Sequence, residues 1–146
     1  MDGAELMRKV AAGFEKSDLQ PLLEAMHDDI VWKTASRQEG VFRFGGEYRG
    51  RAGVLAVLSQ LAMDYTFRRL TPKEILASDD MVWGLCDAVL SFDPKGKQVT
   101  ANCVDLEIAI RWRLKDGKVI EHQAFFDTAA LLIQQGRLTG RELHNL

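Results

Sequence analysis

The stretch Val104–Phe126, VDLEIAIRWRLKDGKVIEHQAFF, is typical of two long β-strands joined by a tight turn. Apolar and polar residues alternate on both sides of Asp116 and Gly117, and an Asp-Gly pair between two alternating runs is the strongest short-range signal of a β-hairpin. The first run has one purely apolar face, made of Val104, Leu106, Ile108, Ile110, Trp112 and Leu114. The stretch therefore predicts an antiparallel hairpin with one face buried in a core.

The second run of the hairpin contains a histidine on its mostly apolar phase. His122 shares that phase with Ile120, Ala124 and Phe126, so a period of two sends all four side chains inward. A polar group in such a position must find a hydrogen-bond partner, or it must line a pocket. His122 is therefore either a structural core histidine or a candidate catalytic residue.

Composition indicates one soluble globular domain spanning residues 1–146, with 47% hydrophobic and 27% charged residues. A formal charge of −2 does not indicate a protein that binds nucleic acid. No apolar run approaches the roughly 18 residues that a membrane span needs. We therefore expect a cytoplasmic protein. Cys86 and Cys103 lie in expected strands without metal-ligand spacing, which predicts reduced core thiols and no metal site.

Three helices are expected before the sheet. Leu6, Val10 and Phe14 recur every four residues and predict a first helix that ends near Lys16. Ser17 and Gln20 match a capping box, which predicts that a second helix starts there and runs until Asp28 and Asp29 stop it. The third helix is expected over 54–64.

Strands are expected over 30–35, 67–77, 81–92, 99–114 and 119–126, followed by a short helix that Asp127 or Thr128 caps and Gly136 ends. Asp127 is expected to serve as this cap and not in pocket chemistry. The run 36–51 is rich in glycine and charged residues, which predicts a loop. Its aromatic residues, Phe42 and Phe44, are either a lid over a cavity or plugs at the edge of the core.

Helices followed by an antiparallel meander predict an α+β fold with the helices packed on one face of the sheet. The segments DDIVW (28–32), YRGRAGV (48–54) and LKDGKVIEHQAFFD (114–127), in this order, resemble the nuclear transport factor 2-like superfamily in its SnoaL-like and ketosteroid-isomerase-like branch. The resemblance implies a cone-shaped α+β barrel, in which a strongly bent antiparallel sheet wraps around N-terminal helices. It also implies an apolar pocket and a homodimer formed through the sheet face.

The resemblance does not carry every chemistry of the superfamily with it. Where steroid isomerases place their catalytic Asp, Asp and Tyr, this chain matches Thr34, Ile110 and Val10, which disfavours that mechanism. The inner phase of 104–114 offers no Asp or Arg, which disfavours the epoxide hydrolase mechanism. SnoaL-like cyclases use a histidine and an aspartate as acid–base groups, and this implies His122 with Asp87 as the catalytic pair.

The orientation of Asp87 is open. The apolar phase of 81–92 contains Cys86 and Ala88, which places Asp87 on the outer face, whereas alignment with the family places Trp83 and Asp87 inward. The residues expected to line the pocket are Trp32, Thr34, Trp83, Ile108, Ile110, Trp112, Ala124 and Phe126.

Two functions follow. One is a cofactor-free enzyme that acts by acid–base chemistry on a small apolar carbonyl or polyketide-like ring compound, with His122 as acid or base. The other is a binding module that holds a small apolar ligand without turning it over. On the outer face, Asp105, Glu107, Arg111 and Arg113 carry both signs, which suits either a two-fold dimer or a solvated surface.

Overall fold

The computed structural model describes residues 1–34, 42–93 and 102–136. Four helices and six strands follow in the order α1 (Gly3–Glu15), α2 (Gln20–Ala25), β1 (Met26–Thr34), β2 (Gly46–Arg49), α3 (Gly50–Asp64), β3 (Tyr65–Ala77), β4 (Met81–Phe92), β5 (Asn102–Lys115), β6 (Lys118–Phe126) and α4 (Thr128–Gln134). The start of the strand expected at 99 and part of the loop expected over 36–51 lie outside the described residues.

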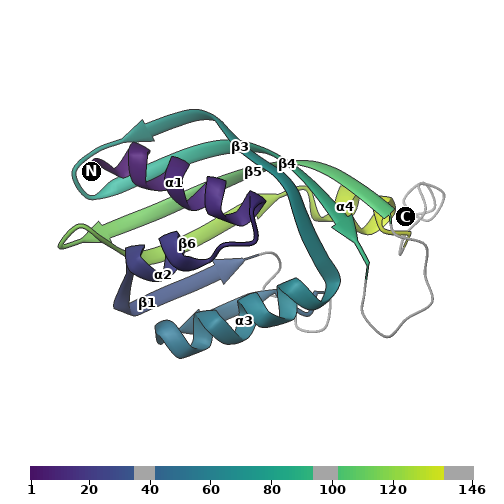
Figure 1. Ribbon diagram of the computed structural model, residues 1–146, viewed down its shortest axis with the longest axis horizontal. Helices are drawn as coiled ribbons and strands as arrows, with labels where there is room; N and C mark the ends of the chain where they lie inside the picture. The colour runs from purple at the N-terminus through teal and green to yellow at the C-terminus, as the bar shows by residue number, and fades with distance from the viewer. Residues whose placement is uncertain (35–41, 94–101, 137–146) are drawn as a thin grey trace.

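The six strands form one curved, open sheet in the order β2-β1-β6-β5-β4-β3, and α1, α2 and α3 pack on its inner face (Figure 1). The α+β fold with N-terminal helices enclosed by a bent sheet is confirmed. The expectation of a wholly antiparallel sheet is wrong at one pair, because β1 and β6 run parallel. Parallel neighbours need a long connection, and here α3 and the strands β2 to β5 separate the two in sequence.

The hairpin of β5 and β6 forms as its sequence predicts. Lys115 pairs with Lys118, and the two turn residues, Asp116 and Gly117, have φ values of 53° and 73°. Positive φ at both central positions is what a two-residue type I′ hairpin turn requires, and Asp-Gly meets this requirement at low cost. A register shift beyond the turn changes the phase of β6 locally, so that Val119, and not Ile120, is fully buried.

The second helix is shorter than expected. Ser17 adopts φ 56° and forms no capping box; the Asp18 carboxylate accepts the backbone N–H of Gln20 instead, at 3.0 Å. The helix ends at Ala25, because β1 begins at Met26, so Asp28 and Asp29 lie in the strand. A capping box does form at α1, where the Asp2 carboxylate accepts the N–H of Glu5 at 2.8 Å.

The segment that was expected to be a loop contains β2, a four-residue edge strand paired with β1. Its glycines and charges fit a short, solvated sheet edge. Phe42 and Phe44 are buried, with ring centroids 6.2 Å and 6.3 Å from that of Phe126. Both therefore pack at the edge of the core, and Phe44 also lines an internal cavity. Cys86 is a buried thiol as expected, whereas Cys103 is exposed.

We predict opposite effects for the same change at two helical glycines. A Cβ at Gly13 would lie 2.5 Å from the backbone oxygen of Asp18, whereas the nearest atom to a Cβ at Gly53 would be the carbonyl carbon of Tyr48, at 3.6 Å. Gly13→Ala should destabilise the protein by about 1 to 3 kcal/mol, because a backbone atom must move. Gly53→Ala should stabilise it by about 0.5 to 1 kcal/mol through helix propensity. Urea unfolding of both variants measures this, and a stabilised Gly13→Ala would contradict the packing of α1 against the turn that follows it.

Candidate functional site

Three aromatic side chains lie in one row across three neighbouring strands. His122 in β6 is in register with Trp32 in β1 on one side and with Trp112 in β5 on the other. All three are buried, at 6%, 6% and 2% exposure. The alternation of each strand sends the three side chains to the same inner face, so the row is a direct consequence of strand register.

His122 is held by a stack and a hydrogen bond. Its ring lies parallel to the Trp32 indole, with centroids 3.6 Å apart and planes inclined by 10°. Its Nδ1 accepts the indole N–H of Trp112 at 3.0 Å. Because Nδ1 is the acceptor, the proton of the neutral ring is on Nε2. Within the described part of the chain, no protein group pairs with Nε2.

Burial lowers the pKa of His122 from 6.5 to about 3, because the apolar surroundings penalise the charged imidazolium. The imidazole is therefore neutral throughout the physiological range. Burial, and after it the neighbouring Asp87 carboxylate, raises the pKa of the Cys86 thiol to about 11, so this group is also neutral.

A cavity of about 110 Å³ lies between the helices and the inner face of the sheet, and His122 is in its wall. The described lining residues include no carboxylate, lysine or arginine; apart from indole N–H groups, their polar side chains are His122, Thr34, Tyr65 and Cys86. A cavity of about 150 Å³ in another protein is known to hold benzene. The volume here is therefore on the scale of a single small ring.

The structure brings most of the expected pocket residues together around this cavity. The lining includes Trp32, Thr34, Ile108, Ile110, Trp112, His122, Ala124 and Phe126. Their inward orientation follows from strand alternation, which is the signal that the sequence carried. Whether these residues bind a ligand stays a prediction.

Two expected site residues lie elsewhere. Asp87 points to the outer face, where its carboxylate is 3.1 Å from the Lys73 ammonium group, and Trp83 is 41% exposed on that face. The alternative in which both face inward is therefore wrong, and the structure does not bring Asp87 to His122. The reason is the pleat of β4, whose inner positions are occupied by residues such as Cys86 and Ala88.

Several lining residues were not expected from the sequence. The helices contribute Met7, Val10, Ala11, Phe14, Leu22, Val57, Leu58, Leu61 and Leu131. The apolar stripe of the first helix marked Val10 and Phe14 as buried, but not as cavity walls. Tyr65 also lines the cavity, and its hydroxyl donates to Oε1 of Gln135, next to the end of α4. No short-range pattern joins residues so far apart in the chain.

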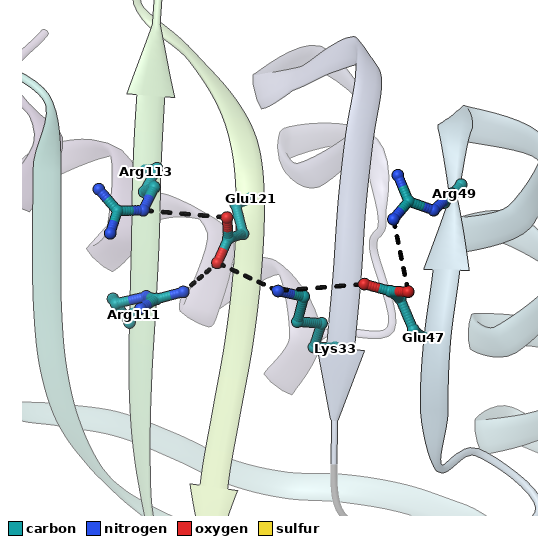
Figure 2. A network of polar contacts seen from close by, with 6 residues as sticks. All are labelled: Lys33, Glu47, Arg49, Arg111, Arg113 and Glu121. Atoms are coloured by element: carbon teal, nitrogen blue, oxygen red, sulfur yellow. Dashed lines mark hydrogen bonds and ion pairs between the residues drawn. The ribbon is translucent and has the colours of Figure 1, made fainter. Parts of the chain in front are cut away.

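Figure 2 shows that the outer face of the same strands carries a network of ion pairs. Glu121 in β6 contacts both Arg111 and Arg113 of β5, and its Oε1 is 3.6 Å from Nζ of Lys33 in β1. Lys33 and Arg49 in turn contact Glu47 of β2. Arg111 and Arg113 of the charged outer face therefore already form ion pairs within the chain. Nε of Arg111 is buried and has no hydrogen-bond partner among the described residues.

Two further properties concern the described residues alone. No group of three or more His, Cys, Asp or Glu side chains among them is arranged to hold a metal ion. None of their helices is long and apolar enough to cross a membrane.

Comparison with solved structures identifies the fold as nuclear transport factor 2-like. An NTF2-like protein of unknown function from Burkholderia pseudomallei is 21% identical and superposes with a TM-score of 0.77, over 90% of this chain and 95% of that one. TerC, crystallised with polyporic acid, is 25% identical with a TM-score of 0.73, over 90% of this chain and 95% of its own. A proposed SnoaL-like polyketide cyclase from Jannaschia is 18% identical with a TM-score of 0.73, over 90% and 89% of the two chains.

The chain belongs to the family of SnoaL-like domains, because the model of that family matches residues 7–122. This range begins within α1, includes α2, α3 and the strands β1 to β5, and ends in β6 at the histidine of the cavity. No curated protein matches the chain.

We predict that His122 makes the stability of the fold depend on pH. Above pH 6.5 the ring is neutral in the folded and unfolded states, and its ionisation contributes no pH dependence. Between pH 6.5 and about 3 the unfolded chain binds a proton that the folded chain does not, so stability is lost as the pH falls, by up to about 1.4 kcal/mol per pH unit.

Urea unfolding of the wild type and of His122→Asn at pH 7, 6 and 5 checks this prediction. The wild type should lose more stability than the variant at each step down, because the carboxylates and other histidines are common to both. Parallel pH profiles would contradict the assignment of His122 as a buried neutral group.

Proposed function

We propose that this protein is a cofactor-free enzyme of the SnoaL-like family that acts on a small apolar carbonyl or polyketide-like ring compound held in the cavity. The observation that carries the proposal is the unpaired Nε2–H of neutral His122 in an otherwise apolar wall. A donor in such surroundings favours a ligand with a hydrogen-bond acceptor, because Nε2 has no partner among the described residues of the wall and gains one when such a ligand binds.

The proposed role of His122 is to donate from Nε2 to the carbonyl oxygen of the compound. Donation stabilises the negative charge that develops on this oxygen when an enol group of the compound adds to the carbonyl carbon. The new C–C bond forms as the C=O π bond breaks, and the enol O–H proton passes through water to the new alkoxide oxygen. The role of general base suits the site less well, because the one lone pair of the neutral ring is already bonded to Trp112. Thr34 lines the same cavity, and its hydroxyl has no hydrogen-bond partner among the described residues, so this hydroxyl is a second candidate donor.

Relatives support this class of ligand. The structure of TerC was obtained with polyporic acid, a protein of the same fold is a proposed polyketide cyclase, and AclR from Streptomyces galilaeus, a proposed hydroxylase, is 22% identical with a TM-score of 0.69. These descriptions concern those proteins, and they favour an enzyme of small ring compounds here.

A second candidate is a binding module that holds the same class of ligand without turnover. It is favoured by the composition of the cavity wall, whose described residues include no group that is charged at neutral pH. Acid–base catalysis at a carbon atom normally needs a base whose pKa is near the working pH.

His122→Phe separates these functions, because it removes the donor but keeps a flat ring. Cyclohexanone and heptane-2,6-dione, which can close to a six-membered ring by aldol addition, serve as probes on the scale of the cavity. Affinity is followed by NMR titration and product by chromatography with mass spectrometry. For an enzyme, turnover per folded molecule should fall roughly a hundredfold to a thousandfold. Ile110→Leu, a change of shape in the same wall, is the control and should keep most of the activity.

Binding of the probes by the wild type without any product would support the binding module. Unchanged affinity and turnover in His122→Phe would contradict both functions as proposed, since each depends on donation from His122.

We also propose that the protein forms a homodimer through the outer face of the sheet. Trp83 and Phe125 are 41% and 45% exposed there and stack on each other with centroids 6.2 Å apart. Exposed aromatic side chains on a sheet are typical of interface centres. Because Arg111 and Arg113 already pair with Glu121, the aromatic pair supports the dimer better than these charged residues do.

The single domain over 1–146 and the cytoplasmic location stay predictions.

Sedimentation at micromolar concentration should give a dimer, and Phe125→Lys should shift it to the monomer by placing a charge in the interface. Met63→Lys puts the same charge on α3, at a residue of similar exposure, 40%, and should leave the dimer intact. A Phe125→Lys dimer as stable as that of the wild type would place any interface elsewhere.

A further inference from the structure

Trp32 and Trp112 hold His122 by different contacts. Trp32 stacks on the ring face, a contact that fixes the plane of the imidazole but does not distinguish its two nitrogens. Trp112 approaches in hydrogen-bond geometry and contacts one nitrogen, Nδ1, at 3.0 Å. The second contact alone is sensitive to where the proton of His122 lies.

The direction of this hydrogen bond cannot be reversed. An indole nitrogen is a donor only, in contrast to a hydroxyl or a carboxamide, which can present either a donor or an acceptor. If the proton of His122 were on Nδ1, two N–H groups would face each other in a buried place, and both would be unpaired. Trp112 is 2% exposed and in register with His122 on the neighbouring strand, so neither side chain can turn to water.

We infer that Trp112 is a positioning residue that fixes His122 in its Nε2–H tautomer and thereby makes the cavity selective for ligands with a neutral hydrogen-bond acceptor. This inference rests on the proposed function in one respect, namely that a ligand meets His122 in the cavity. Thr34 can donate or accept, so the polarity of the site is set by the Trp112–His122 pair.

The tautomer is tested on the ligand-free protein. In ¹⁵N-labelled wild type, the His122 ring nitrogens should have the chemical shifts of a single Nε2–H tautomer, and a scalar coupling across the hydrogen bond should connect Trp112 Nε1 with His122 Nδ1. In Trp112→Phe the coupling is lost and the two ring shifts should move toward each other, because Nδ1 is no longer held as an acceptor.

Trp83→Phe is the matched control. It makes the same substitution at a tryptophan on the outer face, whose one described ring contact is with Phe125, and it should leave the His122 signals unchanged. The wild-type coupling is measured on the native protein, so the test does not depend on whether Trp112→Phe folds.

Selectivity is tested with cyclohexanone and methylenecyclohexane, which have the same ring and differ in C=O against C=CH₂. Wild type and Trp83→Phe should prefer the ketone by roughly three- to tenfold. In Trp112→Phe the ratio of the two affinities should fall toward one. Because both probes enter the same cavity, which the smaller phenyl ring enlarges, this ratio is insensitive to the change of cavity volume.

An Nδ1–H tautomer in the wild type, or a ketone preference that Trp112→Phe retains in full, would overturn the inference. If neither probe binds, the proposed function fails, while the coupling and the ring shifts still decide whether Trp112 sets the tautomer.

Discussion

The indole N–H of Trp112 and the imidazole of His122 face each other across two paired strands, and both side chains are buried. At 3.0 Å this hydrogen bond satisfies a buried donor and a buried acceptor at once. It explains why a histidine can occupy the inner phase of a central strand without a charged partner. It also determines what the cavity offers to a ligand, since the remaining nitrogen of the ring can only donate.

The same strands perform a different task on each face. On the inner face, the alternation of β5 and β6 places Trp112, His122 and their apolar neighbours around the cavity. On the outer face, the intervening residues Arg111, Arg113 and Glu121 form ion pairs with one another and with Lys33 of β1 (Figure 2). The outer network therefore joins the strands that carry the row of three aromatic side chains, including the parallel pair β1 and β6. Surface ion pairs are individually weak, but a network across several strands favours one register over its alternatives.

The electrical neutrality of the cavity limits its chemistry. Burial keeps both the imidazole of His122 and the thiol of Cys86 uncharged, and Asp87, the one carboxylate proposed as a partner, is paired with Lys73 outside. Stabilisation of a developing oxyanion by a fixed donor needs no charged side chain, whereas removal of a proton from carbon needs a base. The proposed enzyme relies on the first of these, and no described residue of the cavity wall supplies the second.

The sequence alone determined the α+β layout, the β5–β6 hairpin and the inward orientation of Trp32, Thr34 and His122. Each of these depends on local alternation or on the φ preference of Asp-Gly, which are properties of neighbouring residues. Local signals failed at two places. The Asp18 carboxylate replaced the Ser17 cap, and β2 formed in a segment rich in Gly and charge because β1 supplied a partner for it.

Only the tertiary structure decided which residues share the cavity and in what state His122 exists. The Trp32–His122–Trp112 row needs a parallel pairing of β1 with β6, two strands that most of the chain separates, and no short-range pattern contains that register. The neutral form of His122 needs burial by residues from the helices and the sheet together, and its tautomer needs the N–H of a residue on another strand. Desolvation and cross-strand hydrogen bonding are properties of the assembled core, so they could not be predicted from the residues on either side of His122.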